Sequence, residues 1–510
     1  MAQAASTDKK VTQITLDRLP YGHYTAESIT GKEKIVIPPG VTRRELNRDG
    51  LVIAWPSLVE LLLTQLTSMA DQVMVGNMAG QAGVIGLSAV NLAAQPKFLL
   101  MTIVIAMNTG ATAIVAKYRG QQNRKTANEV FRQALILNIL MSAVMTVLGV
   151  IFADRLIGLM SGSGISAETR IQSASYLRIQ MYGMIPLSMT ISVTSALRGI
   201  GDSRTPMVYN TVANVVNLIF NYIMIYGHFG CPELGVAGAS IATVIGQMAA
   251  FFMAFRVMLS GKRYLTLDLH EKIRFDKDLL AQVTNIGLPA MIEQLMMRIG
   301  MMVLTRQVSG LGEVQYAAHS ICFSIQSTSF MLGQAFGNAT TTLMGQSLGK
   351  RRYDMAVLYM RHVRAIGIAI SVGLGIVMML FRFNIVELFN KDPGVISSGG
   401  PIVLVIGIMQ PVLGAQFITT GGLRGAGDTR FTALVTLITV FCLRTSLVLI
   451  LVSQLNLGLN GAWIAIMADQ ICRSTAVVLR YRSGKWARMA LNNAGHPETE
   501  DPEAAVIGEE

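Results

Sequence analysis

The stretch RGIGDSR at residues 198–204 returns as RGAGDTR at residues 424–430, and this repetition decides the fold. Three more pairs of segments match in the same order: IAWPSLVE 53–60 with IGLPAMIE 286–293, Gly120 and Ala127 with Gly349 and Ala356, and LGVAGASIA 234–242 with LGLNGAWIA 457–465. The offset between copies falls steadily from 233 to 223 residues, as small loop-length changes after a duplication would produce. The chain is therefore predicted to contain two copies of one unit.

The composition assigns this repeated unit to a membrane. Hydrophobic residues make up 52% of the 510 residues, and charged residues make up 14%, against about 25% in a soluble domain. The mean hydropathy is +0.48. These values exclude a soluble or disordered chain, and four cysteines exclude a disulfide scaffold. The net charge is +12, but the basic residues form no long stripe interleaved with aromatic residues. We therefore assign the charge to cytoplasmic loops and expect no nucleic-acid partner.

Each copy holds six apolar runs long enough to cross a bilayer core of about 30 Å as helices. The chain is thus predicted to be an all-α polytopic membrane protein that contacts the lipid bilayer, and we expect it to be a monomer. Because six is an even number, both copies enter the membrane from the same side, which gives two six-helix bundles related by a pseudo-two-fold axis along the membrane normal. The twelve predicted transmembrane helices are 51–75, 84–115, 130–152, 169–195, 205–227, 235–258, 279–308, 314–347, 355–381, 396–421, 430–453 and 459–480.

Lysine and arginine set the orientation. Loops after even-numbered spans hold twenty of these residues and loops after odd-numbered spans hold five, which places the even loops and both termini in the cytoplasm. The predicted segments are a polar cytoplasmic segment 1–50, an N-lobe 51–259, a cytoplasmic linker 260–278, a C-lobe 279–481 and a cytoplasmic tail 482–510. The expected location is the inner or plasma membrane.

Several motifs together resemble the multidrug and toxic compound extrusion (MATE) transporters over about residues 48–482. They are MADQVMVG 69–76, the paired RGxGD loops at 198–202 and 424–428, AAHSI 317–321 and LGVAGA 234–239. The resemblance implies a secondary active transporter and no enzymatic activity. The major facilitator family also has twelve spans, but the loop AKYRGQQNRKTA lacks its GxxxDRxGRR-like motif.

The resemblance also implies an ion-coupling site in the N-lobe. Asp71 resembles the aspartate of the first helix, which binds the coupling proton or sodium ion. Asn217 and Asn221 are four residues apart on one helix face and could complete the site with Thr243. Asn221 stands where the family often has an aspartate, which weakens the case for sodium. We therefore expect proton coupling, with no cofactor besides the H⁺ or Na⁺ ion.

Each lobe also carries a Pro-x-x-x-Glu motif, Pro56 with Glu60 and Pro289 with Glu293. We expect these residues at the gate or substrate cleft, with the two glutamates facing one another when the cytoplasmic side is closed. The alternative is that each glutamate bonds within its own lobe. Met297, in a methionine-rich span suited to a cavity of variable shape, stands where the NorM-type branch has a glutamate.

Leu413 similarly stands where that branch has an aspartate. The C-lobe cation site is therefore predicted to be absent, and the chain to be closer to the DinF-type branch. Asp469 and Arg473, spaced i and i+4, are expected to neutralise each other. The RGxGD loops are expected to be structural turns.

The resulting hypothesis is an antiporter that exports amphipathic, cationic drugs or toxic compounds in exchange for protons or sodium. No Walker loop or nucleotide fingerprint is present, so an ion gradient must drive transport. One alternative is a flippase of lipid-linked oligosaccharides, which the following intramembrane basic residues would favour: Lys97, Arg178, Arg298 and Arg444. The other alternative is a non-transporting scaffold.

Overall fold

The computed structural model describes residues 14–22, 35–78, 81–161, 165–261, 263–267 and 276–487. Long helices dominate these ranges, and they follow the predicted duplication. The helices of the first half are α3 (Arg43–Gly76), α4 (Gln81–Gly120), α5 (Arg124–Ile151), α6 (Ala153–Met160), α7 (Ala167–Tyr182), α8 (Met184–Gly199), α9 (Arg204–Tyr226) and α10 (Gly235–Leu259).

The second half repeats this order. Its elements are α11 (Lys277–Ser309), α12 (Glu313–Gly349), α13 (Tyr353–Leu380), α14 (Arg382–Glu387), α15 (Pro393–Gly425), α16 (Thr429–Leu437), the π-helical segment η4 (Ile438–Arg444), α17 (Thr445–Val448), the π-helical segment η5 (Leu449–Gln454) and α18 (Gly458–Arg482). In both halves the third long helix is followed by a short one, α6 after α5 and α14 after α13. This shared detail supports two copies of one unit.

Ten helices of the described ranges are long and apolar enough to cross a membrane. The two remaining predicted spans are also helical. At 169–195 the predicted continuous span is wrong, because α7 and α8 are separate helices that meet at Gly183. Pro186 explains the interruption, since it has no N–H to donate to the carbonyl four residues earlier. At 314–347, α12 is one continuous helix. It is rich in the polar residues Ser, Thr, Gln and Asn and is not among the ten apolar helices.

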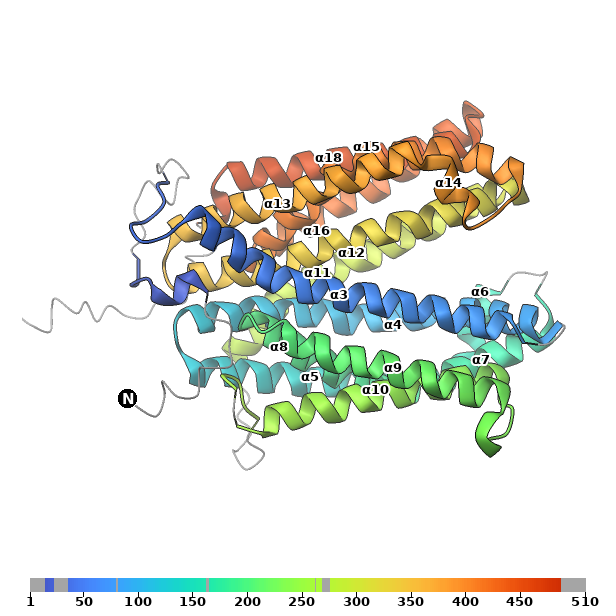
Figure 1. Ribbon diagram of the computed structural model, residues 1–510, viewed down its shortest axis with the longest axis horizontal. Coiled ribbons are helices and arrows are strands. Elements are labelled where there is room, and N and C mark those ends of the chain that lie inside the picture. The colour runs from blue at the N-terminus through green and yellow to red at the C-terminus, as the bar shows by residue number, and fades with distance from the viewer. Residues whose placement is uncertain are drawn as a thin grey trace, which may run out of the picture.

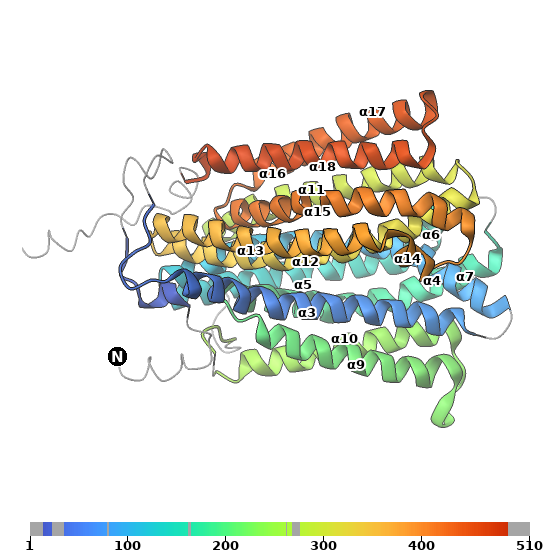
Figure 2. The same ribbon diagram turned by 45° about the horizontal axis from the view of Figure 1, so that its top comes forward.

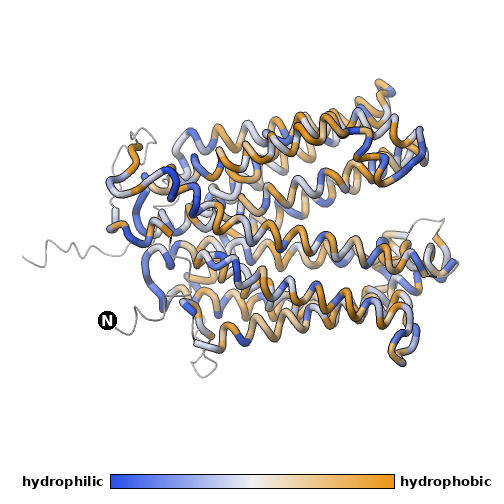
Figure 3. Tube along the Cα trace, viewed as in Figure 1, coloured by the Kyte–Doolittle hydropathy of each residue, from blue (hydrophilic) through white to orange (hydrophobic). Residues whose placement is uncertain are grey.

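The two halves of the chain lie on opposite sides of the molecule (Figures 1 and 2). In Figure 1 residues 14–22, the C-terminal end of α10 and the connections after α4 and α12 gather at the left end, and the halves diverge toward the right. Apolar residues colour most of the helix lengths, whereas hydrophilic residues collect at the ends (Figure 3). This distribution matches a bundle that crosses a bilayer along its long axis.

Backbones of the two halves touch at the left end. A Cβ atom on Gly120 of α4 would lie 2.1 Å from the Gln346 carbonyl oxygen of α12, and one on Gly349 would lie 2.0 Å from the Lys117 carbonyl oxygen. Hydrogen bonds reinforce the contact, since Gln346 Nε2 donates to the Gly199 carbonyl over 2.8 Å. The halves are therefore closed against each other at the end that the sequence predicts to be cytoplasmic.

Part of the predicted polar N-terminal segment is packed into this closed end. The N–H of Thr15 donates to Asp49 Oδ2 of α3 over 2.7 Å, and Lys350 Nζ donates to the Leu16 carbonyl over 2.9 Å. Asp17 also lies 3.7 Å from Arg119 of α4. Residues 14–22 thus contact both halves. Residues 1–13 and 23–34 of the segment 1–50, residues 262 and 268–275 of the linker and the tail beyond residue 487 lie outside the described residues.

Candidate functional site

Four polar residues predicted to form the ion site lie together between α3, α9 and α10. Asn221 Nδ2 donates to the Asp71 carboxylate and to Asn217 Oδ1 over 3.3 Å. Asn217 Nδ2 in turn donates to Thr243 Oγ1 over 3.4 Å. With its amide rotated by half a turn, Asn217 instead donates to Asp71 Oδ1 over 3.0 Å. The two asparagines share one helix face, as their spacing predicts, and both can serve the same carboxylate.

The surroundings of this carboxylate are built largely of neutral polar groups. Asn217 and Asn221 are buried, with 5% and 0% of their surface exposed. Tyr226 donates its hydroxyl hydrogen to the Met74 carbonyl over 2.8 Å, one turn from Asp71. A carboxylate held by amide donors inside a helical bundle can bind either a proton or a small cation. The ion-binding role of these residues remains a prediction.

Lys97 is a neighbour of the site that the sequence did not assign to it. Its Nζ atom donates to Gln180 Oε1 of α7 over 2.7 Å, and Gln180 Nε2 donates to the Ser240 carbonyl of α10 over 3.3 Å. Ser240 lies one helical turn before Thr243 on α10, so the hydrogen bonds of Lys97 and those of Asp71 reach the same part of that helix. The sequence signal was a lysine inside an apolar run. The sequence alone could not say which helices this lysine would contact.

The two glutamates of the Pro-x-x-x-Glu motifs are each paired within their own lobe. Arg198 Nη2 lies 2.8 Å from Glu60 Oε2, and Asn210 Nδ2 donates to Glu60 Oε1 over 2.7 Å. In the C-lobe, Arg424 Nη2 lies 3.0 Å from Glu293 Oε1. The sequence predicted that the two glutamates face one another when the cytoplasmic side is closed, with pairing inside each lobe as the alternative. In this structure each glutamate has the within-lobe pairing.

The RGxGD loops therefore do more than reverse the chain. Their arginines neutralise the buried glutamates, and their aspartates pair with other basic residues: Asp202 with Arg263 at 2.9 Å and Asp428 with Arg480 at 2.7 Å. Sequence reasoning missed the Glu–Arg partnership. The signal was present, because both motifs recur together in each half. Pro56 and Pro289 lie inside α3 and α11, which continue through them.

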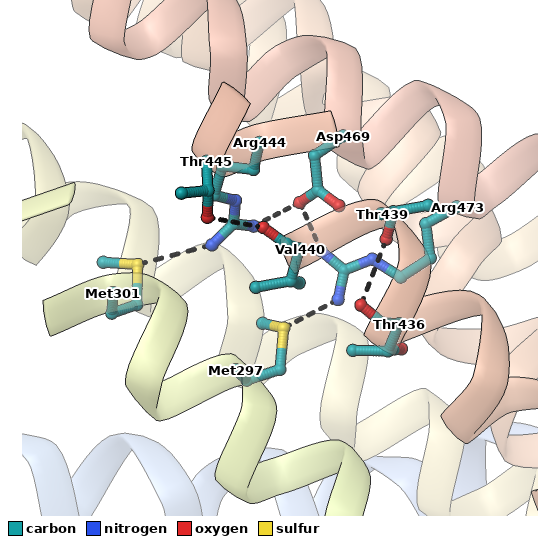
Figure 4. A network of polar contacts seen from close by, with 9 residues as sticks. All are labelled: Met297, Met301, Thr436, Thr439, Val440, Arg444, Thr445, Asp469 and Arg473. Carbon is teal, nitrogen blue, oxygen red and sulfur yellow. Dashed lines mark hydrogen bonds and ion pairs between the residues drawn. The ribbon is translucent and has the colours of Figure 1, made fainter. Parts of the chain in front are cut away.

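The C-lobe holds a separate buried cluster of charges (Figure 4). Arg444 of η4 and Arg473 of α18 both bind Asp469 Oδ2, the latter over 2.7 Å. Their side chains are at most 4% exposed. The expected Asp469–Arg473 pair is thus a triad that includes Arg444. Figure 4 also places Met297 beside it, with Sδ 2.8 Å from Arg473 Nη1.

The four basic residues that would favour a flippase have different partners. Arg178 pairs with Asp154, and both side chains are exposed. Arg298 lies over the ring of Phe98, 5.1 Å from its centroid. Lys97 belongs to the N-lobe site and Arg444 to the C-lobe triad. These separate partners argue against a common pocket for a pyrophosphate group.

Comparison with known proteins places this architecture in one class, that of multi-pass membrane transporters. The model of the MatE family matches residues 56–223 and 289–450, one segment in each half. The chain belongs to the MatE family, whose members are multidrug efflux transporters rather than enzymes.

Two relatives show how far the similarity extends. The chain is 29% identical to a probable multidrug resistance protein NorM of Thermotoga maritima, over 88% of this chain and 94% of that one. It is 27% identical to the multidrug resistance protein PmpM of Pseudomonas aeruginosa, over 91% and 96%. The predicted preference for the DinF-type branch over the NorM type finds no support, since NorM proteins are among these relatives.

Solved structures share the fold. A structure described as the outward-facing conformation of a multidrug resistance MATE family transporter has a TM-score of 0.78 at 20% identity, covering 91% of this chain and 99% of that one. A MATE crystal structure in a bent conformation has a TM-score of 0.79 at 20% identity, covering 89% and 99%. At this identity the likeness concerns the fold alone.

Proposed function

We propose that the protein is a secondary active antiporter of the inner or plasma membrane, which exports amphipathic compounds in exchange for protons. The observation that carries this proposal is the convergence of Asn217, Asn221 and Thr243 on Asp71, in a chain whose relatives are named as multidrug resistance proteins. One carboxylate among amide and hydroxyl groups is suited to bind and release a proton.

The proposed mechanism rests on the hydrogen bond between Asn221 and Asp71, which protonation of Asp71 weakens. Ionised Asp71 accepts a hydrogen bond from Asn221 of α9 and so ties α3 to α9. Protonation weakens this bond, because a neutral carboxyl is a poorer acceptor than a carboxylate. α3 then repacks against its neighbours and reduces the space for substrate. The proton drives transport only because it binds the two conformations with different affinity.

The proposed direction of transport is inferred from which end of the molecule is closed. The lysine- and arginine-rich connections after α4 and α12 lie at the end where the halves touch, so under the positive-inside rule the conformation is outward-facing with both termini in the cytoplasm. In an exporter, this is the state from which substrate leaves and protons enter.

The sequence also predicts a preference for cationic substrates, from Glu60 and Glu293. Each of these carboxylates has an arginine beside it, so the proposal depends on amphipathic character rather than on substrate charge. The flippase alternative is not favoured, because its four basic residues have different partners.

Expression in a bacterial host that lacks its own efflux pumps tests the proposal. Cells that make the protein should accumulate less ethidium or norfloxacin than cells that make the Asp71→Asn variant at an equal level. Equal accumulation of several amphipathic dyes with and without the protein would contradict multidrug export.

A further inference from the structure

We propose that the ammonium group of Lys97 is a covalently tethered counter-cation for Asp71, which takes the place of a sodium ion and makes the N-lobe site select protons. This inference rests on the proposed antiport and deepens it, because it assigns the ion specificity to one residue.

The position of Lys97 is fixed by a chain of hydrogen bonds that leads to the α10 side of the site. Lys97 Nζ donates to Gln180 Oε1 over 2.7 Å, and Gln180 donates to the carbonyl of Ser240. Ser240 Oγ donates to the carbonyl of Tyr176 over 3.0 Å. Ser240 lies one helical turn before Thr243 on α10, and Thr243 accepts from Asn217 at the edge of the carboxylate.

The groups in the hydrogen-bonded sets of Asp71 and Lys97 come from α3, α4, α7, α9 and α10. α3 contributes Asp71 and α4 contributes Lys97, whereas α7 contributes the neutral Gln180 and the backbone carbonyl of Tyr176. The groups from α9 and α10 are amides and hydroxyls: Asn217, Asn221, Ser240 and Thr243. Among the described residues of this hydrogen-bonded set, one carboxylate and one ammonium therefore carry the ionic charge.

This charge balance distinguishes sodium from a proton. A sodium ion must give up most of its water, gather several oxygen ligands and approach an ammonium of like charge in a medium of low dielectric constant. A proton needs only one carboxylate oxygen, with which it forms a covalent bond. Asn221 in place of a second carboxylate further reduces the attraction for a metal cation, because it leaves Asp71 with a single, already balanced negative charge.

Replacing Lys97 by methionine tests the inference, because methionine keeps the unbranched shape and removes the charge. We expect purified wild-type protein to show no saturable binding of ²²Na⁺, and Lys97→Met to bind it. The added substitution Asp71→Asn should abolish that binding. Lys97→Arg, which keeps the charge, should behave like the wild type.

The pH dependence of transport provides a second readout. A nearby cation favours the ionised form of a carboxylate, so in Lys97→Met the profile should shift toward higher pH by about one unit. Lys97→Arg should restore the wild-type profile, which a merely structural role for Lys97 would not require. Where Lys97→Met elutes as an aggregate from a sizing column, Gln180→Leu, which removes the acceptor and keeps the charge, should give a smaller shift.

Two results would overturn the inference. One is a Lys97→Met protein that is monodisperse, binds no ²²Na⁺ and keeps the wild-type pH profile. The other is saturable ²²Na⁺ binding by the wild type that Lys97→Met leaves unchanged. Sodium binding is measured without transport, so these results are distinct from a failure of the wild type to export substrate, which would contradict the proposed antiport itself.

Discussion

Arg198 Nη2 lies 2.8 Å from Glu60 Oε2 and so joins the two motifs that recur in each half of the chain. Arg424 and Glu293 repeat the contact at 3.0 Å. Each pair links the first long helix of its half to the helix before the RGxGD turn, α3 to α8 and α11 to α15. Such a link within each lobe favours motion of the lobes as rigid bodies, as an alternating-access transporter requires.

Glu60→Gln should destabilise the protein by about 2 kcal/mol, because it removes the charged acceptor of the mostly buried Arg198. Glu293→Gln should have a similar effect through Arg424. Thermal unfolding in detergent, followed by loss of monodisperse protein, measures both. The exposed Glu387→Gln is the control and should leave the midpoint unchanged. Midpoints for Glu60→Gln equal to that of the control would show that the pair contributes nothing to stability.

Asp71→Asn should abolish coupled efflux while the protein stays folded and inserted. The amide can still contact Asn221, but it cannot be protonated at physiological pH, so the ion-driven step is lost. Dye efflux from cells or vesicles measures this, with Asp154→Asn at an exposed position as the matched control. Wild-type efflux rates from well-folded Asp71→Asn protein would remove Asp71 from the mechanism.

Asp469→Asn should be more damaging to stability than Glu60→Gln, at about 3–5 kcal/mol. It would leave Arg444 and Arg473 as two adjacent buried cations, with 2% and 4% exposure. Adding Arg444→Met should recover part of the loss by removing one of them. The yield of monodisperse protein and its thermal midpoint test this order. A double variant less stable than Asp469→Asn alone would contradict the charge argument.

Asp49→Ala should loosen the N-terminal segment from the closed end. Asp49 Oδ2 accepts from the N–H of Thr15 over 2.7 Å and from the Tyr359 hydroxyl over 2.8 Å, so its removal leaves two buried donors unpaired. We expect a loss of about 2 kcal/mol and faster proteolysis after Arg18. Tyr359→Phe, which removes only one donor, should have a smaller effect. Unchanged proteolysis would show that the segment is held by its apolar contacts alone.

The internal repeat made most of the architecture predictable. The apolar runs predicted helices in the right regions, although the span at 169–195 is two helices, and the spacing of Asn217 and Asn221 placed both on the face that meets Asp71. The break at Gly183 was missed because both flanking stretches are apolar and Pro186 lies near the start of α8, where proline is tolerated.

Tertiary partners were harder to predict than helices. That Arg198 serves Glu60 and that Arg444 joins Asp469 depends on how distant helices pack, over sequence separations of 138 and 25 residues. Apolar periodicity identifies a buried face but not the residue that faces it. Lys97 illustrates this limit, since its sequence position fits a cavity-lining cation as well as a neighbour of Asp71.

Transport in proteoliposomes under separately imposed ion gradients tests proton antiport most directly. Purified protein is reconstituted, and efflux of ethidium is followed with a pH gradient in sodium-free buffer, then with a sodium gradient at equal pH. We predict efflux driven by the pH gradient alone, abolished by a protonophore and absent in Asp71→Asn. Efflux that requires sodium, and that a pH gradient without sodium fails to drive, would contradict the account.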